Sequence, residues 1–398
     1  MASTPPTVVV NVETESATNF ASLEPTSVVV IHPGSLNLRI GKASDTSPIT
    51  IPHVIARRNK SRNNLIPCQE DPYLIPAAKI DKDSAKQINE TLLAVANTLT
   101  TFSTENGIQR VTLAKDRIFE QNKKAKAVVL PKTVPPAHQW TSFDGKPDTI
   151  VGESVLLLKP TEPYHVRWPI RRGLLNVHEG VGGSLLSAIS DLEAIWSYAI
   201  TKLLHIPLSD LKNYKAVLVI PDVYVRNQVK ELINLLLKNL GFESCFIQHE
   251  AICATFGAGL SVATVIDIGD QKTSICCVED GSSSRTTRIT LEFGGSDITQ
   301  LFHYLLKQRG FPYSELKSES RIGGLLLQSL KHEFCHLDPA ISGTRLKQFQ
   351  VSIPEQPQLQ YNMLISDECI HAPLALFHPE LFCVTGNKTR ITLRRVEN

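Results

Sequence analysis

The fold of this chain is decided by a stretch that reads TVIDIGDQKTSICCV at residues 264–278. An apolar run leads into a short turn that contains glycine and polar residues, and a second apolar run follows the turn. This pattern predicts two antiparallel strands joined by a tight turn. A glycine turn lets backbone N–H groups approach a phosphate closely, and a carboxylate such as Asp267 at the strand end can hold a hydrated Mg²⁺.

The same plan occurs near the start of the chain, where residues 28–43 read VVVIHPGSLNLRIGKA. Val28 to Ile31 predict a strand, His32 to Ser35 have turn chemistry, and Leu36 to Ile40 predict a second strand. A single glycine hairpin is weak evidence, because most such hairpins contact no phosphate. Two of them suggest a duplicated fold with two facing halves. The string FGGSDI at 293–298 adds a predicted helix start with paired glycines, which favours an anion.

Helix and strand patterns alternate between the two hairpins. Apolar residues recur at spacings of three and four from Ser184 to Leu204, which is typical of a helix that buries one face. Ala216 to Ile220 predict a strand, and Val229 to Leu240 predict a helix ended by Gly241. This alternation predicts an α/β fold.

The composition excludes several classes of protein. With 41 basic and 39 acidic side chains, the chain has no overall charge that would attract nucleic acid or a membrane surface. The eight cysteines form no Cys-x-x-Cys pair, which argues against a zinc or redox site and indicates reduced thiols. The first residues lack the features of a signal peptide, and no run of about 18 apolar residues occurs. We therefore expect a soluble intracellular protein with no membrane partner.

Taken together, these stretches resemble the actin family over residues 28–390, apart from an insertion at about 60–147. The motifs that carry the resemblance are IHPGSLNLRIGKA at 31–43, IPHVIARR at 51–58, IVGE at 150–153, RWPIRRG at 167–173, DLEAIWSYAI at 191–200, VLVIPD at 217–222, IQHEAICATFGAG at 247–259, VIDIGDQKTS at 265–274 and FGGSDIT at 293–299. The HPGS turn, the WPIRRG string and the VEDG after the second hairpin point to the nuclear, chromatin-remodelling branch of actin-related proteins.

The resemblance implies an actin-like ATPase fold built from two ribonuclease H-like halves. We expect a disordered tail at 1–27, a first lobe at 28–260 with the insertion at about 60–147, and a second lobe at 261–398. The family places another Gly-Gly turn beneath the adenine, and no such pair follows Gly323-Gly324 here. We therefore expect a chain truncated at its C-terminal side, with an incomplete second lobe that lacks the adenosine side of the pocket.

The resemblance also implies the residues of a nucleotide-binding site. The residues expected to contact the phosphates of ATP are Gly34, Ser35 and Leu36 of the first turn, Asp267, Ile268, Gly269 and Asp270 of the second turn, and Arg39, which takes the place of a basic residue that reaches the β-phosphate. No catalytic residue and no metal ligand is assigned.

Two departures from the family pattern bear on catalysis. His32 stands where actin has a carboxylate, and an imidazole is a poor partner for Mg²⁺, although His32 can also be read as a turn residue with no ligand. Glu250 stands where actin uses a glutamine to orient the attacking water, and its negative charge would repel phosphate. We expect ATP as a candidate ligand, weak or absent hydrolysis, and no enzyme activity, while the role of Mg²⁺ stays open.

The leading hypothesis is a non-catalytic subunit of an INO-eighty-type chromatin-remodelling complex in the nucleus, with roles in DNA repair, DNA recombination and transcription regulation. Its implied partners are the motor subunit, other actin-related proteins and the histones of the nucleosome. Two basic clusters, Arg57 to Arg62 and Lys123 to Lys126, are candidates for DNA contact. The alternatives are an ATPase or kinase of the same superfamily and a cytoskeletal actin-like protein.

Overall fold

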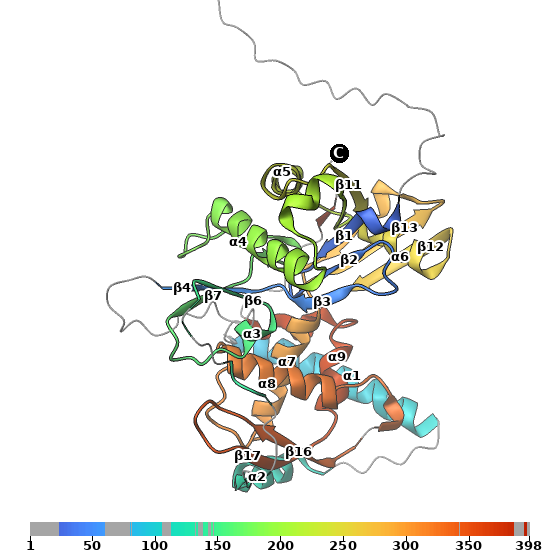
Figure 1. Ribbon diagram of the computed structural model, residues 1–398. Coiled ribbons are helices and arrows are strands. Elements are labelled where there is room, and N and C mark those ends of the chain that lie inside the picture. Colours follow the sequence, from blue (N-terminus) through green and yellow to red (C-terminus); the bar gives the residue numbers. More distant parts are fainter. Residues whose placement is uncertain are drawn as a thin grey trace, which may run out of the picture.

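The computed structural model describes residues 24–59, 80, 82–105, 113–131, 133, 138–141, 145, 147–341, 343–385 and 394–395, without the side chains of 100–105, 385, 394 and 395. Most of the tail predicted at 1–27 lies outside these residues, and Pro25–Ser27 forms one 3-10 turn directly before the first strand. Figure 1 shows two bodies, one holding both predicted hairpins and the other consisting mainly of helices.

The first hairpin lies inside a mixed five-stranded sheet with the order β11-β10-β1-β2-β3. Its strands are β1 (Val28–Pro33), β2 (Asn37–Lys42), β3 (Ile49–Pro52), β10 (Lys215–Ile220) and β11 (Ser244–His249). β1 pairs with β10 in parallel and with β2 antiparallel. The strand β1 runs two residues further than predicted, so His32 and Pro33 belong to the strand and the turn itself is Gly34 to Leu36.

Two helices cover this sheet, as their apolar periodicity predicts. They are α4 (Leu185–Tyr198), which continues as a π-helical segment at Ala199–Leu203, and α5 (Arg226–Asn234), which continues as a π-helical segment at Leu235–Leu240. Trp196 is fully buried against the sheet, together with Leu192 and Ile195. Gly241 ends the second helix with a φ of 82°, a left-handed conformation that suits glycine.

The second hairpin starts another sheet, with the order β12-β13-β15-β18 and β14 paired to β13. The strands are β12 (Val262–Ile268), β13 (Thr273–Glu279), β14 (Ser282–Ser283), β15 (Ile289–Leu291) and β18 (Arg394–Arg395). The helix α6 (Glu250–Ala258) connects the two sheets and packs its residues Ala251 and Ile252 against β13.

A small three-stranded sheet follows the first hairpin along the chain. It has the order β6-β4-β7 and consists of β4 (Ile55–Arg58), β6 (Thr149–Val151) and β7 (Tyr164–Arg167), with the short helix α3 (Glu153–Leu156) and the hairpin β8 (Ile170–Arg171) and β9 (Leu174–Leu175) beside it. Trp168 and Tyr164 fill its core.

The helical body contains most of the remaining elements. Its helices are α7 (Gly295–Gln308), α8 (Arg321–Phe334) and α9 (Glu368–Leu374), and its sheet has the order β16-β17-β5, with β16 (Arg345–Val351), β17 (Leu359–Ile365) and β5 (Val128–Val129). The core of this body includes Leu301, Phe302 and Met363.

The described part of the segment at 60–147 packs on the helical body. This part includes α1 (Lys82–Glu105), α2 (Lys115–Lys124) and β5. Ile88 of α1 is fully buried in the same core as Phe302, and the amide of Asn122 donates to the carbonyl groups of Arg309 and Leu364 at 2.8 Å each. The segment that was expected to be an insertion therefore packs on the helical body. The apolar face of α1 is buried in the core of that body, and Figure 1 shows α1 lying beside it.

Candidate nucleotide-phosphate site

The turn of the first hairpin is held by hydrogen bonds on both sides. The amide of Gly34 donates to the carbonyl oxygen of Asn37 at 2.9 Å, which closes the turn. The carbonyl oxygen of Leu36 accepts from the amide of His53 at 2.8 Å, and the Leu36 side chain packs on the core around Trp168. Ser35 is nearly buried, and its Oγ accepts from the amide of Gly173 at 3.0 Å.

His53 supports this turn from beneath. Its Nδ1 donates to the carbonyl oxygen of Gly34 at 2.8 Å, and its Nε2 accepts from Nε1 of Trp196 at 3.3 Å. Because Nε2 acts as an acceptor, the imidazole must be neutral. Complete burial lowers the pKa of His53 to about 4, which keeps the ring in this form at neutral pH.

The turn of the second hairpin is bonded to the start of α7. The amide of Gly269 donates to the carbonyl oxygen of Lys272 at 2.9 Å within the turn. The carbonyl oxygens of Gly269 and Asp270 accept from the amides of Gly295 and Ser296, at 3.0 Å and 2.7 Å. The expectation that the paired glycines offer free amides to an anion is therefore wrong for these two groups, because the second turn already occupies them.

Paired glycines are nevertheless needed at this place. A methyl group on Gly294 would overlap the carbonyl oxygens of Gly269 and Asp270. The amide of Gly294 donates to the carboxylate of Asp297 at 2.9 Å, which caps the helix from inside. The glycines thus allow the helix start to touch the turn.

Arg172 and Gly173 connect the two turns, and sequence reasoning did not single them out. The Gly173 amide bonds Ser35 of the first turn, and the amide of Arg172 donates to Oε1 of Gln271 in the second turn at 2.9 Å. Their only sequence signal is the family motif RWPIRRG, which shows no chemistry by itself. The two turns are therefore neighbours in space.

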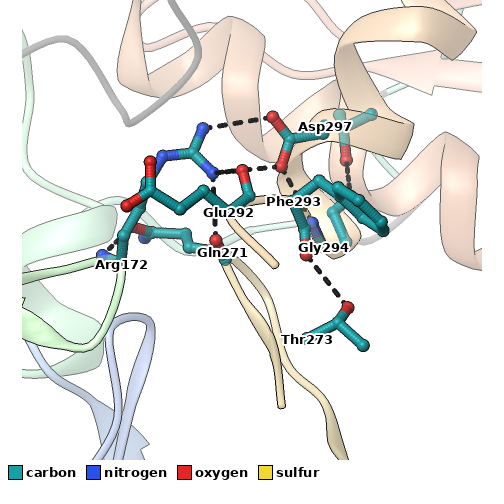
Figure 2. Close-up of polar contacts among 9 residues, drawn as sticks. Arg172, Gln271, Thr273, Glu292, Phe293, Gly294 and Asp297 are labelled. Atoms are coloured by element: carbon teal, nitrogen blue, oxygen red, sulfur yellow. Dashed lines mark hydrogen bonds and ion pairs between the residues drawn. The ribbon is translucent and has the colours of Figure 1, made fainter. Parts of the chain in front are cut away.

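Figure 2 shows the guanidinium of Arg172 among its polar contacts with Gln271, Glu292 and Asp297. Its Nη1 donates to the carbonyl oxygen of Gln271 at 3.0 Å and also to that of Glu292, and its Nη2 contacts Oδ1 of Asp297 at 3.2 Å. Burial raises the pKa of Asp297, and the charge of Arg172 opposes this rise. The Arg172 side chain thus joins the second turn, the loop at Glu292 and the start of α7.

Glu250 and His32 meet Lys272, a third residue that the sequence did not mark. Nε2 of His32 lies 3.1 Å from Oε1 of Glu250, and the ammonium of Lys272 bonds Oε2 of the same carboxylate. Lys272 also donates to Oγ of Ser274 at 3.1 Å. Burial would raise the pKa of Glu250, but the bond from His32 and the charge of Lys272 outweigh it and hold the pKa at about 2. Both oxygens of the Glu250 carboxylate are therefore engaged by basic groups.

An open cleft of about 640 Å³ lies beside this cluster, between the first hairpin and β12. Of the expected site residues, Arg39 and Asp267 line the cleft, together with His32 and Glu250. The expected residues that are not part of its lining are Gly34, Ser35, Leu36, Ile268, Gly269 and Asp270. Asp270 is instead half-buried beside Lys331, and desolvation raises its pKa.

The described residues offer no ready-made site for a divalent metal. Within the part of the chain that the structure describes, no three His, Cys, Asp or Glu side chains form a cluster that could hold a metal ion. In that same part no helix is long and apolar enough to cross a membrane.

Comparison with known protein families finds a match to the model described as actin, over residues 23–334. Among curated proteins, actin-related protein 8 of Salmo salar is 45% identical over 364 residues, which are 91% of this chain and 56% of that protein. Actin-related protein 8 of Homo sapiens is 43% identical over 361 residues, 91% of this chain and 57% of that protein. The chain thus spans little more than half the length of these relatives.

A solved structure agrees with these sequence matches. The structure described as human actin-related protein Arp8 in its ATP-bound state superimposes with a TM-score of 0.86 at 41% sequence identity. The match covers 94% of this chain and 74% of the human chain.

Proposed function

The chain belongs to the actin family, and on that premise we propose that it binds ATP without hydrolysing it and serves as a scaffold subunit in chromatin remodelling. Three statements make up this proposal: nucleotide binding, absence of turnover, and assembly with nuclear partners. Each has its own support.

Nucleotide binding is supported by the approach of the two hairpin turns. Arg172 and Gly173 bond to Gln271 and Ser35, so both turns lie at one place. The cleft beside them carries the basic side chain of Arg39, which is exposed and free to meet a phosphate. The similar human protein has been captured with ATP. We propose the phosphates at this place, next to Ser35 and the second turn at 267–270.

The absence of hydrolysis follows from the state of Glu250, which is the single observation that carries the proposal. A general base works best with a pKa near the working pH, whereas the pKa of Glu250 is about 2. Both of its carboxylate oxygens are occupied by His32 and Lys272. With this pKa and these two basic partners, the side chain is a poor base for an attacking water.

The scaffold role rests on the resemblance to actin-related proteins of the chromatin-remodelling branch. We propose an INO-eighty-type complex in the nucleus, whose motor subunit, other actin-related proteins and histones are the partners. Roles in DNA repair, recombination and transcription regulation would follow from membership of such a complex.

The two basic clusters differ in their availability for DNA. The Arg57 side chain is taken up by Asp191, with Nε 2.6 Å from Oδ1, and by the Ser190 carbonyl at 2.9 Å. Residues 60–62 of the same cluster lie outside the described residues. Lys123 and Lys124 are exposed at the end of α2. The cluster at 123–126 is therefore the better candidate for contact with DNA phosphates.

Affinity purification of the tagged chain from nuclear extract tests the scaffold role. We expect the remodelling motor and other actin-related proteins to be recovered with it. The variant Lys123→Glu/Lys124→Glu should recover the same proteins but less nucleosomal DNA, with Lys212→Glu/Lys238→Glu as a matched change of charge elsewhere. Recovery of no remodelling subunit, from a chain shown to be folded, would contradict the role.

A further inference from the structure

The ammonium group of Lys272 occupies a position that matters for a phosphate ligand. Lys272 is 9% exposed and belongs to the second turn, at the start of β13. An ammonium group has three N–H donors. Two of them are directed to Glu250 and Ser274, so one remains for a phosphate oxygen. A buried ammonium is a stronger local charge than an exposed one, because water screens it less.

Lys272 is not itself part of the cleft lining, but its partner Glu250 is, and other basic side chains line the same cleft. His32 contacts the other oxygen of Glu250, and Arg39 projects from β2 into the cleft lining. The charge of Glu250 is matched by Lys272, and the cleft lining adds Arg39 and Lys42 as cations and Asp45 and Asp267 as anions. The basic donors that can meet a polyphosphate are therefore Arg39, Lys42 and Lys272.

The same cluster does not fit Mg²⁺. This ion demands oxygen ligands in octahedral arrangement and takes up carboxylates and phosphate oxygens. The imidazole of His32 supplies nitrogen, and each oxygen of the Glu250 carboxylate already contacts a basic partner. Two other carboxylates of the cleft, Asp45 and Asp267, have no ion-pair partner among the described residues. Asp45 already accepts from the amide of Lys42 at 2.7 Å, and Asp267 provides at most two oxygens. A cation beside Lys272 would also be repelled by the ammonium.

We propose that this site binds the triphosphate of a nucleotide without a divalent metal, with Lys272 in the place of the metal ion and Arg39 and His32 beside it. The inference rests on the nucleotide binding proposed above and adds how the phosphate charge is neutralised. No bond is formed or broken in this step: the third N–H of Lys272 donates to a phosphate oxygen while Glu250 keeps the ammonium in position.

Isothermal titration of the full chain with ATP, in 2 mM Mg²⁺ or in EDTA, tests the inference directly. We expect the Kd in EDTA to stay within about threefold of the Kd in Mg²⁺. A loss of affinity in EDTA by tenfold or more would overturn the inference and leave nucleotide binding itself intact. Absence of binding under both conditions would overturn the proposed function together with this inference.

A pair of variants separates the charge of Lys272 from its structural role. Lys272→Met alone leaves the buried Glu250 without its ammonium partner and with only the His32 contact, which endangers folding, so we combine it with Glu250→Gln to remove both charges of the pair. A purely structural defect would weaken binding equally in Mg²⁺ and in EDTA. If Lys272 replaces the metal, the double variant should lose about tenfold or more in EDTA and recover most of this loss in Mg²⁺. An unchanged ratio of the two Kd values contradicts the inference.

Asp267→Asn is the control for a metal ion held by the carboxylate of Asp267. In a metal-independent site, this variant should bind ATP in EDTA as tightly as the parent or slightly more tightly, because a negative charge has been removed near the phosphates. A variant that binds as the parent does in EDTA but more weakly in Mg²⁺ would show that Asp267 holds the ion and would overturn the inference.

Discussion

Single side chains set the chemistry of the candidate site, and His53 shows how burial enforces one protonation state. Its ring is fully buried between the Gly34 carbonyl and the Trp196 indole, and its neutral form is the only one that satisfies both hydrogen bonds. A protonated ring would have to face the indole N–H with a second N–H. The first turn therefore depends on a histidine that remains uncharged.

The low pKa of His53 predicts acid sensitivity. The folded pKa of about 4 lies below the ordinary histidine value of 6.5, so the unfolded chain binds the proton first and stability is lost as the pH falls through this window. Between pH 7.5 and pH 5, the protonation of His53 is expected to lower the free energy of unfolding by about 2 kcal/mol. Urea unfolding at both pH values measures it.

The matched variants for this measurement are His53→Gln and His378→Gln. His378 is exposed, so its replacement should leave the pH dependence as it is in the parent chain. His53→Gln should reduce the stability at pH 7.5 and flatten the dependence below pH 6.5. An equal pH dependence in the parent and in His53→Gln would contradict the assigned role.

The sequence predicts which residues belong to the cleft better than it predicts which of them contact one another. The patterns of residues 28–43 and 264–278 are enough to place Asp267 and Arg39 on hairpins, and both line the cleft. The family pattern also marks Glu250 and His32. The sequence pattern does not mark Lys272, because its role depends on the buried carboxylate of Glu250, which is 22 positions away in the chain.

At the scale of elements, the contact between the second turn and α7 orders the site. Glycine at 294 permits the carbonyl groups of the turn to reach the helix amides, since a methyl group there would overlap both carbonyl oxygens. The overlap involves backbone atoms, so it cannot be relieved by a side-chain rotation.

Gly294→Ala should therefore destabilise the fold by roughly 1–3 kcal/mol, in the range of overpacked sites. It should also weaken ATP binding, because the second turn must move. Gly257→Ala is the matched control, since a methyl group there meets nothing within 4 Å, and it should be neutral or slightly stabilising in α6. Thermal unfolding and ATP titration of both variants measure the effects, and a Gly294→Ala chain as stable as the Gly257→Ala chain would refute this account.

Element positions were predicted well and element partners were not. Apolar periodicity identifies the helices at 185–198 and 226–234, because a buried stripe needs only local spacing. The apolar residues on one face of α1 do not indicate which core they join. In the structure they belong to the core of the helical body, which contains Phe302. Pairing over such sequence distances depends on the whole fold, which no local pattern contains.

At the scale of the molecule, Arg172 joins segments that lie far apart in the chain. Its guanidinium contacts the carbonyl groups of Gln271 and Glu292 and the carboxylate of Asp297. A bridge of this kind, next to the two hairpin turns, fits a scaffold in which these segments keep one relative position.

Arg172→Met should destabilise the chain by roughly 1–3 kcal/mol, because the carboxylate of Asp297 is then left buried without its cation. Combining it with Asp297→Asn should restore part of this loss, since the amide oxygen still accepts from Gly294 and carries no charge. Urea unfolding of the parent, both single variants and the double variant gives the coupling between the two residues. If the losses of unfolding free energy in the two single variants simply add up in the double variant, Arg172 and Asp297 do not stabilise each other and this account is contradicted.

The central claim is that the chain holds ATP and leaves it intact. A single-turnover experiment with γ-labelled ATP and an excess of the full chain tests this most directly, because bound nucleotide and released phosphate are measured in the same sample. The account predicts labelled ATP retained on the protein and phosphate release no faster than with heat-denatured chain. Bound ATP that is converted to ADP and phosphate clearly faster than in this control would contradict it.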